Sequence, residues 1–261
     1  MFCALTSVIR EKVGKLHDDF AFLKHFSYSC KKVFSGSRWA LTGEAGVFLD
    51  PFYSPGSDFI AIANTYITEL IALDRAHQPI GMYARIFEQF FMSFYDSTMS
   101  LYRGQYPLFG DPEVLPVKVI WDYTYYWGVL CQIFFQGRLT DLSVISHLRA
   151  ELEGSKELNF AIQAFLREWS AHSKRRNPSR LFDQARLDWF AELNRGLRDQ
   201  LDDDGFKERI RATTNQLRQL AREIVITACN ECPDLDGGAV LRLIEVPGEP
   251  VVTQRLIDFA A

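Results

Sequence analysis

Apolar residues recur at helical spacing through most of the chain, and this periodicity constrains the fold more than any other feature. The segment 83–102, for example, carries Phe87, Phe91 and Phe94 three or four residues apart. From Ser57 onward the pattern predicts a succession of helices, separated by glycine and proline. The expected helices cover residues 57–73, 83–102, 115–136, 141–153, 156–172, 180–202 and 206–229, and residues 240–246 are expected to form a short strand or an extended tail.

Strand character is confined to the N-terminal part of the chain. Residues 22–34 alternate apolar and polar side chains, and residues 38–42 form a second short run. Ser35-Gly36-Ser37 is a turn signal between them, which favours a small antiparallel ribbon. The predicted fold class is therefore mainly α, with a short β remnant in a strand–loop–helix unit, and a boundary near residues 74–79 divides segment 1–76 from a helical segment 77–261.

Composition limits the classes of partner. The 261 residues are 48% hydrophobic and carry a net charge of −4, so a large core is expected and broad nucleic-acid binding is not. No apolar run reaches the ~18 residues of a membrane span. The number of cysteines is odd and they are widely spread, which favours reduced thiols and a cytoplasmic location. They are Cys3, Cys30, Cys131, Cys229 and Cys232.

One stretch, residues 39–58, is typical of a ligand-facing loop. A short strand ends at Gly43, and Glu44 then places a carboxylate in a turn kept free of bulk by small residues. Asp50-Pro51 begins an irregular segment, because the residue before proline avoids the helical region. Ser57 is expected to cap the following helix, whose N-terminal N–H groups suit a phosphate or another electron-rich group. An ordinary strand–loop–helix connection is the alternative interpretation.

The same stretch resembles the second flavin-binding motif of FAD-dependent monooxygenases and flavin-dependent halogenases. In that family a Gly-Asp-Ala-Ala turn precedes an [Asp/Glu]-Pro-x-x-Ser-x-Gly loop and a helix. Glu44 stands where aspartate is usual, and Tyr53 stands where tryptophan halogenases carry a catalytic glutamate, which argues against a halogenase of that kind. The matching residues are Gly43, Glu44, Ala45, Gly46, Asp50, Pro51, Ser54, Gly56 and Ser57.

The resemblance implies FAD as the cofactor and oxidoreductase activity. It implies that Glu44 contacts flavin hydroxyls and that the loop and helix start lie against the cofactor. Family members open with a Gly-x-Gly-x-x-Gly unit that holds the ADP half of FAD, and no such sequence occurs here. The chain is therefore expected to be the C-terminal portion of such an enzyme, with an N-terminal flavin-binding partner chain as one possibility.

Other candidate sites carry weaker signals. The aromatic run from Trp121 to Trp127 is interpreted as a buried central helix, with a pocket for a small aromatic or apolar substrate as the alternative. Asp122 within it needs a partner if it is buried. Cys229-x-x-Cys232 has no second such pair, and the histidines lack ligand spacing, so the sequence predicts no metal site.

A rival hypothesis is non-enzymatic. Without an ADP-binding unit the chain is either an inactive remnant that binds no flavin alone, or a helical interaction or scaffold domain. Exposed strand edges would then favour self-association.

Overall fold

The protein is mainly α-helical, as the apolar periodicity predicts. A computed structural model describes residues 28–176, 183–245 and 256. Within these residues the sheet structure consists of one two-stranded antiparallel ribbon, and helices make up most of the rest. Most of the strand expected at residues 22–34 lies outside the described residues.

The ribbon pairs β1 (Phe34–Ser35) with β2 (Trp39–Ala40). Phe34 lies opposite Ala40 and Ser35 opposite Trp39, so the chain reverses at residues 36–38 as the turn signal predicts. Phe34 is fully buried and anchors the ribbon, with its ring edge-on to those of Tyr66 and Phe91.

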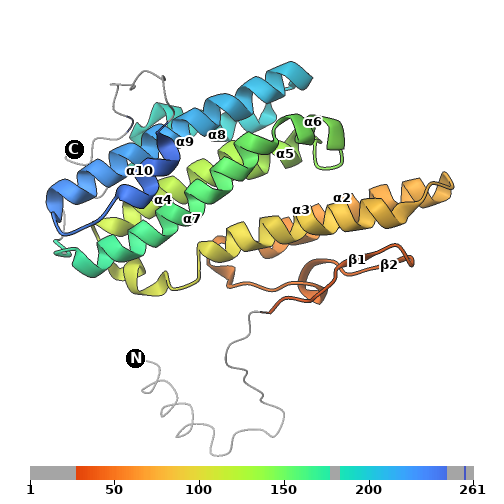
Figure 1. Ribbon diagram of the computed structural model, residues 1–261, viewed down its shortest axis with the longest axis horizontal. Coiled ribbons are helices and arrows are strands. Elements are labelled where there is room, and N and C mark those ends of the chain that lie inside the picture. Colours follow the sequence, from red (N-terminus) through yellow and green to blue (C-terminus); the bar gives the residue numbers. More distant parts are fainter. Residues whose placement is uncertain (1–27, 177–182, 246–255, 257–261) are drawn as a thin grey trace, which may run out of the picture.

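Two long helices, α2 (Gly56–Arg75) and α3 (Ile80–Ser100), pack against each other and against the ribbon. Figure 1 shows this pair extending beyond the rest of the molecule, with the ribbon alongside. Aromatic side chains fill the interface, for example the stacked rings of Tyr66 and Phe87, whose centroids are 4.7 Å apart. The hydrophobic core of this part therefore continues across the boundary expected at residues 76 and 77.

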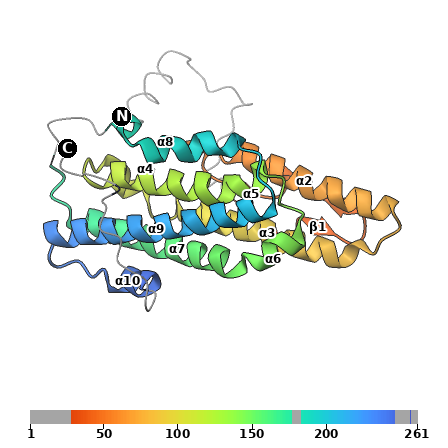
Figure 2. The same ribbon diagram turned by 90° about the horizontal axis from the view of Figure 1, so that it is seen from above.

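The second core lies in a bundle built on α4 (Val114–Tyr125), α7 (Arg149–His172) and α9 (Asp203–Glu231). Figures 1 and 2 show these three helices side by side. The shorter elements around them are η3 (Tyr106–Gly110), α5 (Cys131–Phe135), α6 (Leu142–His147), η5 (Gln184–Arg186), α8 (Asp188–Arg195), η6 (Gly196–Arg198) and α10 (Gly238–Ile244).

None of the helices in the described part of the chain combines the length and the apolar character that crossing a bilayer would need.

Two predicted boundaries are wrong. The chain breaks at Leu148, between α6 and α7, and α7 then runs through Gly154, where the sequence suggested a break. Residues 240–244 belong to helix α10 and form neither a strand nor an extended tail, because Val240 and Ile244, four residues apart, are buried on one face against α7 and α9. In both cases packing between helices overrides the local signal.

The helix that begins with α4 continues into α5 through a five-residue π-helical turn, η4 (Tyr126–Leu130). Gly128 in this turn lies against α9: a Cβ atom added there would stand 2.3 Å from Cγ2 of Thr213, which is itself buried. The close approach of these two helices therefore requires glycine at this position.

We predict that Gly128→Ala lowers the free energy of unfolding by about 1–3 kcal/mol, because the added methyl group overpacks a closed interface. Gly154→Ala is the matched control. It also lies within a helix, but nothing stands within 4 Å of its added Cβ, so the higher helix propensity of alanine should raise stability by about 0.5–1 kcal/mol. Urea denaturation measures the free energy of unfolding of both variants. Equal changes in the two would contradict the tight contact between Gly128 of η4 and α9.

Candidate functional site

The turn at residues 43–46 is a short 3₁₀ helix, η1 (Gly43–Ala45), closed by Gly46. Gly43 has φ +53°, and an added Cβ would stand 2.5 Å from Cγ1 of Ile60 on α2. Thr42 donates its hydroxyl to Oδ1 of Asn64, 2.9 Å away, also on α2. The turn is therefore fixed beside the first turns of α2, and it leaves Glu44 exposed with no side-chain partner among the described residues.

The loop from Asp50 to Pro55 contains a second 3₁₀ turn, η2 (Pro51–Tyr53). The Asp50 carboxylate accepts a hydrogen bond from the backbone N–H of Phe52 at 2.9 Å, so this predicted site residue organises its own loop. Ser54 follows in the left-handed region, with φ +56°, and reverses the chain into the helix.

Helix α2 begins at Gly56, after Pro55, and no side chain caps it. The expectation that Ser57 caps this helix is wrong. Ser54 already makes the reversal, so Ser57 lies within the first helical turn. An added Cβ at Gly56 would meet nothing within 4 Å. The N-terminal N–H groups of α2 donate to no N-cap side chain and form a positive helix end.

The predicted residues differ in exposure. Glu44 and Ala45 of the turn, and Ser54 and Ser57 near the start of α2, are exposed, whereas Gly43 and Gly46 are buried and Gly56 is half-buried. Asp50 and Pro51 build the connecting loop.

Behind this loop lies a buried ion pair between two side chains of α4, and Gln163 links this pair to α7. Nζ of Lys118 is 2.8 Å from Oδ2 of Asp122 and 2.7 Å from Oε1 of Gln163. Nε2 of Gln163 donates to Oδ1 of Asp122 at 2.6 Å. All three side chains are essentially excluded from solvent, so each polar group needs the others as partners.

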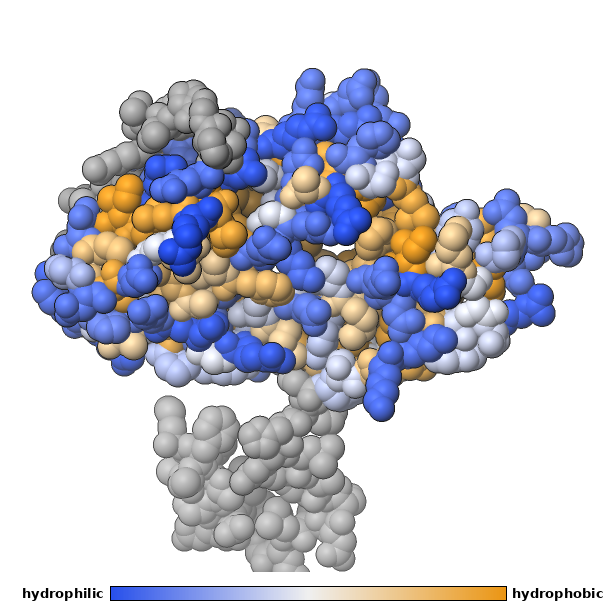
Figure 3. Space-filling view, viewed as in Figure 1, coloured by the Kyte–Doolittle hydropathy of each residue, from blue (hydrophilic) through white to orange (hydrophobic). Residues whose placement is uncertain are grey.

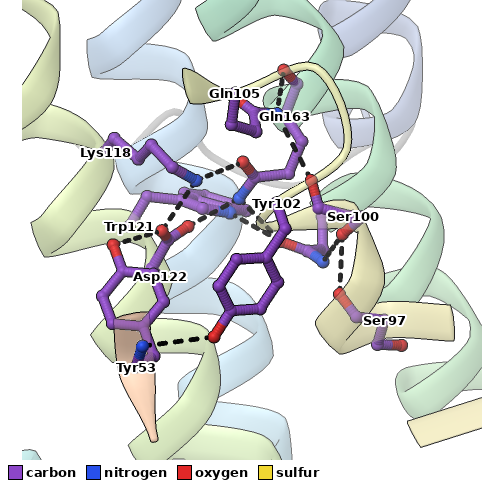
Figure 4. A network of polar contacts seen from close by, with 10 residues as sticks. Tyr53, Ser97, Ser100, Tyr102, Gln105, Lys118, Trp121, Asp122 and Gln163 are labelled. Atoms are coloured by element: carbon purple, nitrogen blue, oxygen red, sulfur yellow. Dashed lines mark hydrogen bonds and ion pairs between the residues drawn. The ribbon is translucent and has the colours of Figure 1, made fainter. Parts of the chain in front are cut away.

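The network reaches the loop through Tyr53, as Figure 4 shows. Its hydroxyl donates to Oδ2 of Asp122 at 2.9 Å, and its backbone N–H donates to the hydroxyl of Tyr102 at 3.2 Å. Burial, together with the neighbouring Asp122 carboxylate, raises the pKa of Tyr53 well above its usual range. Burial lowers the pKa of Lys118, and Asp122 opposes this shift.

A cavity of about 40 Å³ lies between the loop, α3 and α4. Asp58 lines it from the first turn of α2 and accepts a hydrogen bond from the hydroxyl of Tyr126 at 2.9 Å. Burial raises the pKa of Asp58, and this hydrogen bond opposes the shift. The lining residues are Tyr53, Pro55, Asp58, Phe94, Thr98, Leu101, Asp122, Tyr123, Tyr125, Tyr126 and Leu130.

The 43–46 turn and the 50–55 loop therefore differ in chemistry. The turn presents the exposed Glu44 carboxylate beside α2, and the uncapped N–H groups of this helix suit an electron-rich ligand. The inner side of the loop presents tyrosines and two hydrogen-bonded carboxylates around a cavity. The Cys229-x-x-Cys232 pair lies elsewhere, at the end of α9, and its thiols donate to backbone carbonyls. No metal-ligating cluster of three or more side chains occurs among the residues described.

The inner network was only partly predictable. The sequence predicts that Asp122, a carboxylate in an apolar helix, needs a partner if it is buried. The structure confirms this need. Lys118 and Gln163 were missed, although each interrupts an apolar face. Lys118 stands four residues before Asp122 on one helix, a spacing that predicts an ion pair.

Comparison with protein-family models, curated proteins and solved structures finds no match. The geometry of the loop and the motif it carries are therefore the basis for a functional proposal.

We predict that Lys118→Met lowers the free energy of unfolding by about 3–5 kcal/mol, because it leaves the Asp122 carboxylate buried without a cation. The control is Arg149→Met, which removes a cation with the same i,i+4 spacing to Glu153, but from a pair whose side chains are 78% and 60% exposed. That change should cost less than about 1 kcal/mol. Chemical denaturation distinguishes the two, and a small effect for Lys118→Met would show that the buried pair is not required.

Proposed function

We propose that the chain is the C-terminal part of an FAD-dependent oxidoreductase resembling flavin monooxygenases and halogenases. The observation that supports this most is the position of the 43–46 turn against α2, where Gly43 stands next to Ile60 and Thr42 donates to Asn64. The turn exposes the Glu44 carboxylate, and the N-terminus of the same helix has no side-chain cap. This is the set of groups that the second flavin motif uses.

The residues present fit the hydroxyl and phosphate-rich part of a flavin cofactor. Glu44 would accept hydrogen bonds from flavin hydroxyls, since its carboxylate has no other partner among the described residues. Gly56 and Ser57 would allow close approach of the cofactor to the helix start, because Gly56 faces open space. When bound, the flavin would supply redox chemistry with oxygen that the side chains of the protein lack.

Tyr53 favours a monooxygenase-like reaction over that of tryptophan halogenases. It occupies the position of their catalytic glutamate, but its hydroxyl donates to Asp122 and its pKa is raised by burial. Tyr53 therefore keeps its proton at neutral pH and supplies no base. Its role in this proposal is to hold the loop against α4.

The proposal requires an ADP-binding unit that these 261 residues do not contain. A Gly-x-Gly-x-x-Gly segment carried by a partner chain would hold the other half of FAD. We further propose a cytoplasmic location, because the described cysteines Cys30, Cys131, Cys229 and Cys232 are free thiols.

The direct test is FAD binding by the purified chain, alone and mixed with a Gly-x-Gly-x-x-Gly partner chain. We expect quenching of flavin fluorescence and flavin that stays with the protein in gel filtration. Glu44→Ala should weaken binding by roughly tenfold or more, since hydrogen bonds to a charged group contribute about 1.5–3 kcal/mol. Glu157→Ala, which removes an exposed carboxylate from α7, is the control and should leave binding unchanged.

Gly56→Ala separates a binding defect from a folding defect. Because an added Cβ meets no protein atom within 4 Å, this variant should be as stable as the parent chain, yet it should lose affinity if the cofactor approaches the helix start. The flavin proposal would be refuted if the parent chain bound no flavin, either alone or with the partner chain. It would also be refuted if Glu44→Ala, Gly56→Ala and Glu157→Ala all bound flavin equally well.

A second candidate function, a helical interaction domain, is favoured by apolar side chains at the surface. Figure 3 shows hydrophobic residues gathered in patches between hydrophilic ones on one face. On α2, Ile60 and Ile71 are 45% and 54% exposed, and Trp39 of the ribbon is 46% exposed. Contiguous exposed apolar surface of this kind commonly marks a protein–protein contact.

Sedimentation velocity over a range of concentrations tests this second candidate. Self-association should be detectable in the parent chain and should decrease in Ile71→Lys, which places a charge on the exposed face of α2. Ile226→Lys alters an equally exposed isoleucine, 51% accessible, on α9 and should have no effect. A monomer at every concentration would exclude self-association through α2.

A further inference from the structure

We infer that the cavity behind the 50–58 loop binds a small organic ammonium cation, held by the Asp58 carboxylate and enclosed by the rings of Tyr53, Tyr123 and Tyr126. The site is lined by the loop, α3 and α4, and Glu44 is not among its lining residues. The inference goes beyond the proposed oxidoreductase activity and does not depend on it.

Charge is the first support. Two carboxylates line the cavity, but only one is neutralised: Asp122 pairs with Lys118 at 2.8 Å. Asp58 forms no ion pair with any described residue, and its only hydrogen bond is the one from the Tyr126 hydroxyl to Oδ2. The second carboxylate oxygen, Oδ1, thus remains available. A cation in the cavity would supply the missing counter-charge in a partly desolvated place, where a charge pair is stronger than in water.

The aromatic walls are the second support. The rings of Tyr53 and Tyr123 lie 5.8 Å apart with an interplanar angle of 84°, and those of Tyr123 and Tyr126 lie 6.5 Å apart at 72°. Adjacent rings thus pack edge to face, and all three tyrosines line the cavity. The negative faces of aromatic rings attract alkylammonium groups.

Size and ligand chemistry exclude the alternatives. A volume of about 40 Å³ leaves room for a group little larger than a water molecule, such as methylammonium, and not for an aromatic substrate or a trialkylammonium group. A divalent metal ion would require about six oxygen ligands for Ca²⁺ or Mg²⁺, whereas Oδ2 of each carboxylate already accepts a tyrosine hydroxyl. An anion would face the unpaired Asp58 charge. An ammonium group with apolar substituents satisfies both the carboxylate and the rings.

The titration of Asp58 agrees with this assignment. Burial raises its pKa, and the titratable groups that face it are Tyr126 of η4 and Cys131 of α5, whose thiol pKa burial raises to about 12. Both neighbours are therefore neutral at pH 7, and the other carboxylate of the cavity, Asp122, is paired with Lys118. Cation binding should strengthen as the pH rises through the pKa of Asp58, because only the ionised carboxylate attracts the ligand.

The test is an NMR titration of the full chain, without flavin, with methylammonium chloride as the probe. Its methyl resonance should broaden and shift in a saturable way. Methanol has the same methyl group without the charge and should not bind detectably, and sodium chloride controls for ionic strength. Asp58→Asn should weaken methylammonium binding by at least about tenfold, as expected for the loss of a charge pair.

Substitutions of two of the tyrosines test the inference independently, in case Asp58→Asn disturbs folding. Tyr126→Phe keeps the aromatic wall and frees Oδ2 of Asp58, so binding should be as tight or tighter. Tyr123→Leu removes a wall and should weaken binding. Equal binding of methanol and methylammonium, no saturable binding of either, or an affinity unchanged in both Asp58→Asn and Tyr123→Leu would overturn the inference. Because no flavin is added, failure here leaves the flavin result unaffected.

Discussion

The buried ion pair between Lys118 and Asp122 is the interaction on which the geometry of both candidate sites depends. Neither group is exposed to water, so each requires a complete set of protein partners. Gln163 of α7 and the hydroxyl of Tyr53 provide them. In satisfying Asp122, Tyr53 fixes the loop that carries it against α4. The position of the loop is therefore a consequence of charge burial in the helical core.

This attachment places the 50–58 loop next to the cavity, which Tyr53 and Asp58 line. The exposed Glu44 lies in the turn that packs against α2. Helix α2 joins the two candidate sites, because it contacts this turn and its first turn carries the Asp58 carboxylate. The same carboxylate opposes the positive helix end. A cation bound inside would partly cancel the field of Asp58 and so make the helix start more attractive to an anion outside.

Local patterns were sufficient to predict most of the helices and the turns of residues 36–56, whereas contacts between distant residues were not predictable. The 43–46 turn and the loop are encoded by neighbouring glycines and prolines, and the ribbon turn at residues 36–38 follows in the same way. The inner network joins Tyr53, Asp122 and Gln163, which lie 69 and 41 residues apart, and no local pattern specifies such pairings. The break at Leu148 and helix α10 were mispredicted because helix packing, which depends on distant partners, decided them.

The π-helical turn η4 connects the packing of the bundle with the inner cavity. A π turn inserts extra backbone into a helix at a cost in regular hydrogen bonding, and it persists where surrounding contacts require it. Here Gly128 fits against Thr213 on the α9 side, while Tyr126, at the start of the same turn, reaches Asp58 on the opposite side. A regular helix would rotate the residues after Tyr126 by roughly one position, and α9 would then face a side chain in place of Gly128. The irregular turn thus allows the same helix both to pack closely against α9 and to line the cavity with Tyr126.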